Sequence, residues 1–220
     1  MPAGTAALSV APERVWENHR PMTTDDPTSI PLAGDVHTAL VAHLRTHSVR
    51  MGDFVLKSGQ PTGWFIDSKQ TACRPDGVVA MADAALTVIP DDATAIGGLT
   101  MGADPVAFGI AAVGAVRGRS LRSFSIRKES KDHGVEGRLA GALEPGDKVV
   151  ITEDTATRGT SALEAVRVVR ELGAEPVLVL ALVDRGGTAA DLCAAEGVGF
   201  RALVTAPDLG FPFEREIAST

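Results

Sequence analysis

Short apolar runs and segments of helical spacing alternate through the second half of the chain. The run at 177–183 is apolar without alternation, which is typical of a central strand buried on both faces. Regular alternation of strands and helices indicates βαβ units and a mostly parallel sheet covered by helices on both faces. The pattern predicts strands at 94–98, 121–126, 148–152, 177–183 and 200–204, and helices at 105–116, 161–172 and 188–196.

The first half of the chain has a different pattern. Val36, Leu40 and Leu44 recur at a spacing of four and predict an amphipathic helix that Asp35 could cap. Two short strands at 54–56 and 64–66, joined by a turn, and a helix at about 78–88 are predicted to follow. The first 31 residues hold five of the thirteen prolines without a sustained apolar period, which is typical of a flexible extension. We therefore expect a flexible extension over 1–34 and one folded domain over 35–220.

Composition narrows the class of protein. The chain has 220 residues, of which 45% are hydrophobic and 22% charged, as in ordinary globular proteins. Lys and Arg number 21 against 28 Asp and Glu, a net charge of -7, which argues against a surface built to bind nucleic acid. Any anion that the protein binds must therefore meet a local cluster of positive charge.

The cysteines and the apolar runs bear on location. Cys73 and Cys193 lie far apart and fit no metal-binding spacing, so we expect two reduced thiols. The longest aliphatic run is much shorter than the about 20 residues of a membrane span. We expect a cytoplasmic protein with no membrane partner and no nucleic-acid partner.

The sharpest motif is KVVITEDTATRGTSALEAV, at 148–166. Two acids follow a buried strand, and a small polar loop then leads into a helix. Small residues let backbone N–H groups approach an anion, and the helix N-terminus adds about half a positive charge. Two carboxylates beside this site would repel a phosphate alone. They fit a phosphate that carries a sugar, because they accept hydrogen bonds from vicinal hydroxyls. The candidate binding residues here are Glu153, Asp154, Thr155, Ala156, Thr157, Arg158, Gly159, Thr160 and Ser161.

A structural interpretation of this loop is a helix capped by Thr160 or Ser161, as in many α/β proteins. The paired acids and the hydroxyl-rich loop favour binding. The motif also resembles the 5-phosphoribosyl-1-pyrophosphate (PRPP) site of the type I phosphoribosyltransferases. That resemblance implies PRPP as the donor and an α/β fold, a parallel sheet flanked by helices with a small N-terminal hood.

The segment FSIRKESKDHGVEGRLAG, at 124–141, resembles the mobile basic element of the orotate phosphoribosyltransferases. Residues 116–138 hold seven Lys or Arg against three acids, a local net charge of +4 that suits a pyrophosphate. A solvated basic loop is the ordinary alternative, but the ordered spacing of the motif favours function. The candidate residues are Arg127, Lys128, Lys131 and His133.

Two further segments are similar to the same family. In LKSGQPTGWF, residues 56–65, the resemblance implies that Lys57 contacts PRPP and that Trp64 and Phe65 frame the orotate ring. Adjacent strand residues face opposite ways, so we expect at least one of the two aromatics to be in the core. In LALVDRGGTA, at 180–189, the family has the arginine that holds the orotate carboxylate, which implies this role for Arg185.

The resemblance implies the reaction of orotate with PRPP to give orotidine 5'-monophosphate and pyrophosphate, in pyrimidine synthesis. It also implies Mg²⁺ held mainly by PRPP oxygens, with no metal bound chiefly by protein ligands, and a homodimer with shared active sites. Lys131 and His133 would close over pyrophosphate, and Asp154 would handle a proton or grip the ribose. Met101-Gly102 stands where many members have an aromatic residue followed by Lys, and Arg158 is larger than is usual. The alternatives are a transferase for another base and a non-catalytic PRPP sensor.

Overall fold

A computed structural model describes residues 33–55, 61–131 and 137–214, apart from the side chains of Ala33, Ser130 and Lys131. Every described residue belongs to one compact unit within Pro31–Thr220, and the extension predicted at 1–34 lies outside the described residues up to position 32. Among these residues, no helix combines the length and apolar character needed to cross a membrane.

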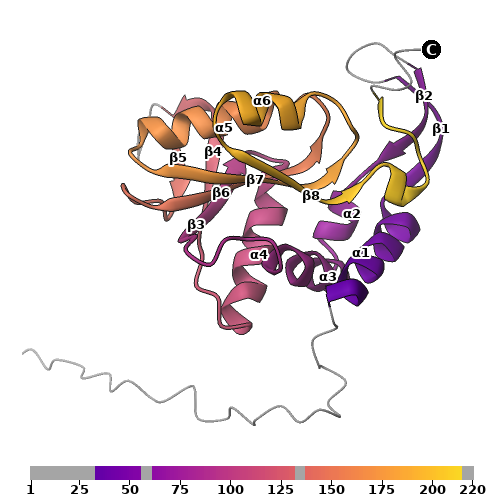
Figure 1. Cartoon of the computed structure of the whole chain (residues 1–220), viewed down its shortest axis with the longest axis horizontal. Helices are drawn as coiled ribbons and strands as arrows, with labels where there is room; N and C mark the ends of the chain where they lie inside the picture. The colour runs from indigo at the N-terminus through magenta and orange to yellow at the C-terminus, as the bar shows by residue number, and fades with distance from the viewer. Residues whose placement is uncertain (1–32, 56–60, 132–136, 215–220) are drawn as a thin grey trace, which may run out of the picture. The chain divides into compact units, whose positions relative to one another are not determined.

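The central sheet has six strands in the order β5-β4-β3-β6-β7-β8. Neighbouring strands are parallel except for β4 and β5, which are antiparallel. This arrangement confirms the predicted α/β fold with a mostly parallel sheet (Figure 1). The strands are β3 (Ala95–Leu99), β4 (Arg122–Lys131), β5 (Gly137–Gly141), β6 (Lys148–Ala156), β7 (Glu175–Asp184) and β8 (Gly199–Thr205).

Helices cover both faces of the sheet (Figure 1). One face carries α5 (Thr160–Glu171) and α6 (Ala189–Ala195), and the other carries α1 (Ala33–His47), α3 (Pro75–Leu86) and α4 (Ala103–Val116). β7 contributes side chains to the hydrophobic core on each face of the sheet.

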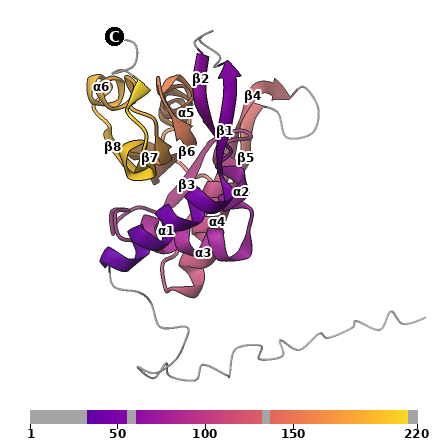
Figure 2. The ribbon, with the colours of Figure 1, turned by 90° about the vertical axis from the view of Figure 1, so that its right-hand side faces the viewer.

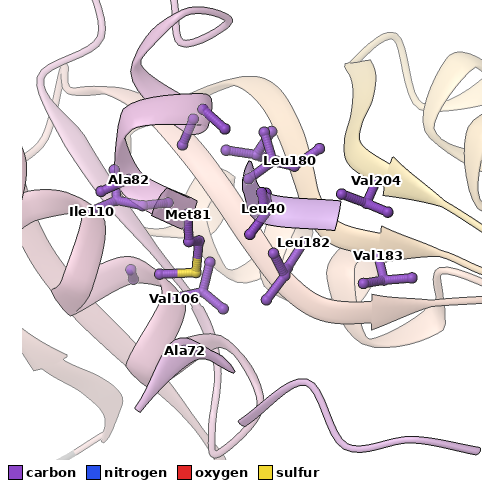
Figure 3. Packing of buried hydrophobic residues seen from close by; sticks show 14 of the residues in the cluster. Leu40, Ala72, Met81, Ala82, Val106, Ile110, Leu180, Leu182, Val183 and Val204 are labelled. Carbon is purple, nitrogen blue, oxygen red and sulfur yellow. The ribbon is translucent and has the colours of Figure 1, made fainter. Parts of the chain in front are cut away.

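The side chains of β7 show how its unbroken apolar run is used. Leu178, Leu180 and Leu182 belong to the core beneath α1, α3 and α4, whereas Val179 belongs to the core beneath α5. Figure 3 shows Leu180 and Leu182 beside Leu40 of α1. Because alternate residues of a strand point to opposite faces, a strand buried on both faces must be apolar throughout.

β1 (Val49–Val55) and β2 (Pro61–Ile66) form a separate two-stranded antiparallel sheet, which comes before the central sheet in the chain. Figure 2 shows the two strands side by side, projecting from the layer of α1 to α4. The short helix α2 (Lys69–Ala72) connects them to α3. This hairpin lies where the sequence predicts two strands and a turn, although the turn itself, 56–60, lies outside the described residues.

Several boundaries differ from those predicted. β6 continues to Ala156, beyond the predicted end at 152, so the two acids lie within the strand rather than directly after it. β4 runs on to Lys131 and pairs with β5, where the sequence predicts a basic loop. Asp35 lies in the first turn of α1, which begins at Ala33, so its prediction as a cap is wrong. Both strands are longer than predicted because their last residues pair with a neighbouring strand. The local sequence pattern cannot predict such pairing.

Candidate active site

The loops that follow β6 and β7 are joined by backbone hydrogen bonds at the carboxyl edge of the sheet. The backbone N–H of Arg185 donates to the Ala156 carbonyl over 2.9 Å, and that of Ala189 donates to the Thr157 carbonyl over 3.3 Å. A Cβ on Gly187 would lie 2.1 Å from the Thr157 oxygen, so only glycine allows this approach. Ligands of open α/β sheets bind beyond this edge. The loops therefore form one wall of a site.

The loop after β6 ends in an uncapped helix. Gly159, in the left-handed conformation with φ of 75°, occupies the N-cap position of α5, and no side chain bonds the helix there. Its missing side chain also allows contact with Ala189, whose Cα would lie 2.8 Å from a Cβ at this position. The structural interpretation with Thr160 or Ser161 as N-cap is therefore wrong. No side-chain cap occupies the first N–H groups of α5 in the described part of the chain, which suits an anion.

Asp154 is the most tightly held acid of the site. Its Oδ2 accepts a hydrogen bond from Ser68 Oγ over 3.1 Å and forms an ion pair with Lys69 Nζ. Its Oδ1 accepts from the Thr155 backbone N–H over 2.9 Å. A Cβ on Gly102 would lie 2.6 Å from Oδ1, so the glycine makes room for the carboxylate. Asp154 therefore joins the end of β6 to the start of α2 and lies against the N-terminus of α4.

The other residues of the loop differ in what they present. Ala156 is buried in a small cluster with Ala181 and Ala189, so its side chain serves packing. Arg158 is exposed, and its carbonyl accepts from Thr188 Oγ1 over 3.3 Å. Residues partly accessible at this edge are Glu153, Thr155, Thr157 and Ser161, with Thr160 exposed.

Arg185 is buried at the end of β7. Its side chain is 5% exposed, and its guanidinium carbon lies 4.3 Å from the ring centroid of Trp64. The Glu214 carboxylate lies 2.5 Å from Nε, in an ion pair without the alignment of a hydrogen bond. Nε and Nη2 are thus buried with no hydrogen-bond partner in the part of the chain that is described. Burial lowers the pKa of Arg185, and the charge of Glu214 acts in the opposite direction.

The segment 211–214 closes around this arginine. Phe211 stacks on Trp64 with ring centroids 4.2 Å apart and an angle of 4° between the planes. The Glu214 backbone N–H donates to the Arg185 carbonyl over 2.8 Å. A Cβ on Gly186 would lie 1.9 Å from the Phe213 ring, so glycine at this position, with φ of 81°, lets the segment pack here.

The two aromatics of β2 have different surroundings, as strand alternation predicts. Trp64 is 4% exposed, whereas Phe65 is 41% exposed and lies 5.6 Å from the ring of Phe54. Trp64 is thus the aromatic that lies beside Arg185.

Comparison with known proteins gives one consistent result. No protein-family model matches the chain. It is 39% identical over 180 residues to the orotate phosphoribosyltransferase of Synechocystis sp., an alignment covering 81% of this chain and 90% of that enzyme. The chain belongs to the orotate phosphoribosyltransferase family. This membership confirms the resemblance based on its motifs.

Solved structures of phosphoribosyltransferases have the same fold. The enzyme of Mycobacterium tuberculosis H37Rv in complex with PRPP superposes with a TM-score of 0.67 at 31% identity, over 80% of this chain and 99% of that one. A phosphoribosyltransferase of Corynebacterium diphtheriae gives a TM-score of 0.72 at 34% identity over the same shares.

The basic element that is similar to that of the orotate phosphoribosyltransferases is less positive than its sequence predicts. Four of the seven cations at 116–138 form ion pairs with carboxylates that all lie outside that range: Arg117 with Asp83, Arg119 with Asp91, Arg122 with Glu144 and Asp147, and Arg138 with Glu164. The positive charge predicted at 116–138 is therefore partly neutralised, because counting charge within a window omits acids brought in by the fold. Arg127 is half-buried, with Nη1 3.4 Å from the carbonyl oxygens of Gly137 and Leu139, and Lys128 is exposed.

Three predicted residues cannot be placed. Lys57 and His133 lie outside the described residues. The backbone of Lys131 ends β4, but its side chain is also outside them. Their roles stay predictions.

Sequence reasoning missed the residues that hold the predicted ones. Ser68 and Lys69 directly follow the β2 hairpin, and this position in IDSK is the only local signal for them. Gly102 stands at a departure from the usual family residues, and its contact with Asp154 explains why a glycine fits there. Glu214 lies far along the chain in a segment with no motif, so no sequence signal indicated it.

Proposed function

We propose that this chain transfers the 5-phosphoribosyl group of PRPP to orotate, giving orotidine 5'-monophosphate and pyrophosphate. The observation that carries the proposal is that two chemically different groups of residues lie side by side at one edge of the sheet: the β6 to α5 loop and the surroundings of Arg185. An uncapped helix N-terminus beside Asp154 suits a sugar phosphate, and a buried arginine on an aromatic face suits a flat carboxylate. Membership of the family indicates which sugar phosphate and which carboxylate these two regions would bind: PRPP and orotate.

The donor would bind along the β6 to α5 loop. The first N–H groups of α5, with Thr157, Thr160 and Ser161, would hold the 5'-phosphate. Glu153 and Asp154 would accept hydrogen bonds from the ribose hydroxyls. Lys69, which already pairs with Asp154, lies in position to attract the negatively charged donor toward these acids.

The acceptor would bind to Arg185. Its Nε and Nη2 are buried without hydrogen bonds to any described residue, which is costly in a packed interior, and the orotate carboxylate would satisfy them with a bidentate contact. Glu214 already supplies one carboxylate to the same guanidinium. Orotate would therefore compete with the charge of Glu214 for Arg185, while Trp64 supplies an aromatic face beside the ring.

Catalysis in this proposal needs no covalent nucleophile. Burial raises the pKa of the Cys193 thiol to about 11, so that thiol is protonated at neutral pH. The rate would come from positioning and from stabilisation of a positive ribosyl centre and the leaving charge. Lys131 and His133 would act on the departing pyrophosphate.

Mg²⁺ fits this site as an ion carried by the substrate. Asp154 Oδ2 is already committed to Ser68 and Lys69, so the ion would find most of its oxygen ligands on PRPP. When bound, Mg²⁺ would neutralise charge on the pyrophosphate. The chain's own contribution is to orient the ribose through Asp154 and to attract the phosphates.

The test of this function follows the ultraviolet absorbance of orotate in the presence of PRPP and Mg²⁺. We expect loss of the orotate signal, and no base-dependent turnover with adenine, hypoxanthine or uracil. Turnover of another base instead of orotate would contradict the acceptor, and tight PRPP binding without turnover of any base would indicate a sensor.

We also propose a cytoplasmic homodimer in which Lys131 and His133 of one subunit serve the other subunit's site. Mixing Lys131→Ala subunits with Arg185→Ala subunits should then restore part of the activity, because one of the two sites in each mixed dimer has both residues. Failure of properly exchanged mixed dimers to recover activity would contradict site sharing.

A further inference from the structure

Two histidines and an aspartate meet where α1 packs against α3, and the proposed function uses none of them. His43 and His47 lie one helical turn apart on α1, and Asp76 lies in the first turn of α3. One ligand atom from each lies within 4.8 Å of the other two. Residues four apart on a helix share a face, so both imidazoles are directed to the same place.

The ring of His43 is held in a fixed orientation. Its side chain is 10% exposed, and Nδ1 lies 3.0 Å from Thr71 Oγ1, which in turn lies 2.7 Å from the buried Ser48 Oγ. A Cβ on Gly77 would lie 2.6 Å from His43 Cε1, so glycine leaves room for the ring. A histidine that binds a metal through one nitrogen commonly donates the other N–H to an oxygen, as Nδ1 can do here.

The second nitrogen of His43 lacks a conventional partner. Nε2 is buried with no hydrogen-bond partner among the described residues, and it lies 3.4 Å from Asp76 Oδ1. In the tautomer in which Nδ1–H donates to Thr71, Nε2 presents a lone pair to the Asp76 carboxylate; in the other tautomer, Nε2 itself carries the proton between the two groups. Two acceptors that face each other at this distance need a proton or a metal ion between them.

We propose that His43, His47 and Asp76 form a binding site for a divalent transition-metal ion of the zinc class. Two imidazoles and a carboxylate are a ligand set that such ions accept, with water in the remaining position. The atom separations of up to 4.8 Å exceed the about 3.4 Å between ligands that each lie about 2.1 Å from a tetrahedral ion. His47 is half-buried and Asp76 is exposed, so both can move inward toward the fixed His43, and an ion can reach them from solvent.

Binding would join α1 to α3. The ion would therefore act on the stability of the helical layer that carries the hairpin, rather than on the reacting groups.

The test uses the full chain without a histidine tag, titrated with Co²⁺ and followed by its visible absorption, then with Zn²⁺ by calorimetry in excess Mg²⁺. We expect one saturable site, and a rise in melting temperature with Zn²⁺. Loss of even an outer-shell partner of a metal site costs about tenfold in affinity, so His47→Gln and Asp76→Asn should each weaken binding by at least that factor. Neither variant removes the buried His43, so both should fold.

Two controls separate this site from other metal-binding side chains. His37→Gln changes a histidine of the same helix that lies 3.6 Å from Asp208, outside the cluster. Cys73→Ser removes an exposed thiol three residues before Asp76. Both controls should bind Zn²⁺ as the unchanged chain does. Absence of saturable binding, unchanged affinity in both cluster variants, or an equal loss in either control would overturn the proposal.

Discussion

The loop after β6 and the arginine after β7 belong to adjacent strands and share a hydrogen bond, yet they obtain their surroundings in different ways. The donor side is mostly one continuous segment, 153–161, stabilised by Ser68 and Lys69 through Asp154. The acceptor side is assembled from β2, the end of β7 and the segment 211–214. A continuous motif makes the donor side recognisable in sequence, whereas the acceptor side depends on residues about 120 to 150 positions apart in the chain.

The largest expected effect comes from the acceptor side. Arg185→Ala should lower kcat/KM for orotate by about 30-fold to 4,000-fold, because removing one partner of a buried charge pair costs about 2–5 kcal/mol. The KM for PRPP should change little. Steady-state kinetics with each substrate varied in turn measures both.

Arg185→Ala also leaves Glu214 unpaired and could reduce stability, so the double variant Arg185→Ala/Glu214→Ala is needed beside it. Arg201→Ala, which changes an exposed arginine of the neighbouring strand β8, is the matched control. Equal losses for orotate and PRPP in the double variant would contradict a separate acceptor side.

The next effect tests the donor side. Lys69→Met keeps the length of the side chain but leaves Asp154 without its cation, so the KM for PRPP should rise by about tenfold. The matched control is Lys148→Met, because Lys148 pairs with Asp92 at the opposite end of β6. A larger change in KM for orotate than for PRPP would show that the two sides are not separable as described.

A smaller effect in the opposite direction is expected at Glu214. Glu214→Gln removes a negative charge but keeps an oxygen that can face Arg185, so orotate should meet less repulsion and its KM should fall by about twofold to fivefold. Kinetics over a range of ionic strength checks the cause, since screening should reduce the difference. A rise in KM would instead mean that Glu214 orients the arginine for its substrate.

The sequence predicted most of the fold because its signals are local. The β7 run and the alternation of strands and helices follow from periodicity, and Glu153 to Ser161 form a single motif. The partners of these residues could not be predicted in the same way. Ser68 and Lys69 reach Asp154 across about 85 positions, and the acids that neutralise Arg117 and Arg138 come from other helices. Charge counted along a window predicts a patch only when the fold brings no opposite charge to it.

The smallest expected effect concerns the two cysteines. One lies near the donor side of the site and the other lies near the acceptor side. Cys73 ends α2 on the donor side and is exposed, whereas Cys193 lies in α6, beyond the acceptor loop, and is fully buried. Burial raises the pKa of the Cys193 thiol from its usual 9.0 to about 11. Because the folded pKa is the higher one, the associated stability is complete below pH 9 and is lost as the pH rises toward 11.

Thiol labelling of the native protein at pH 8 should therefore modify Cys73 rapidly and Cys193 only through opening of the fold, and Cys73→Ser should remove the rapid phase. Chemical unfolding of Cys193→Ala beside the unchanged chain should show a difference in stability that narrows between pH 9 and 11. Rapid labelling of both cysteines would mean that α6 opens readily and that the acceptor side is the less stable of the two walls.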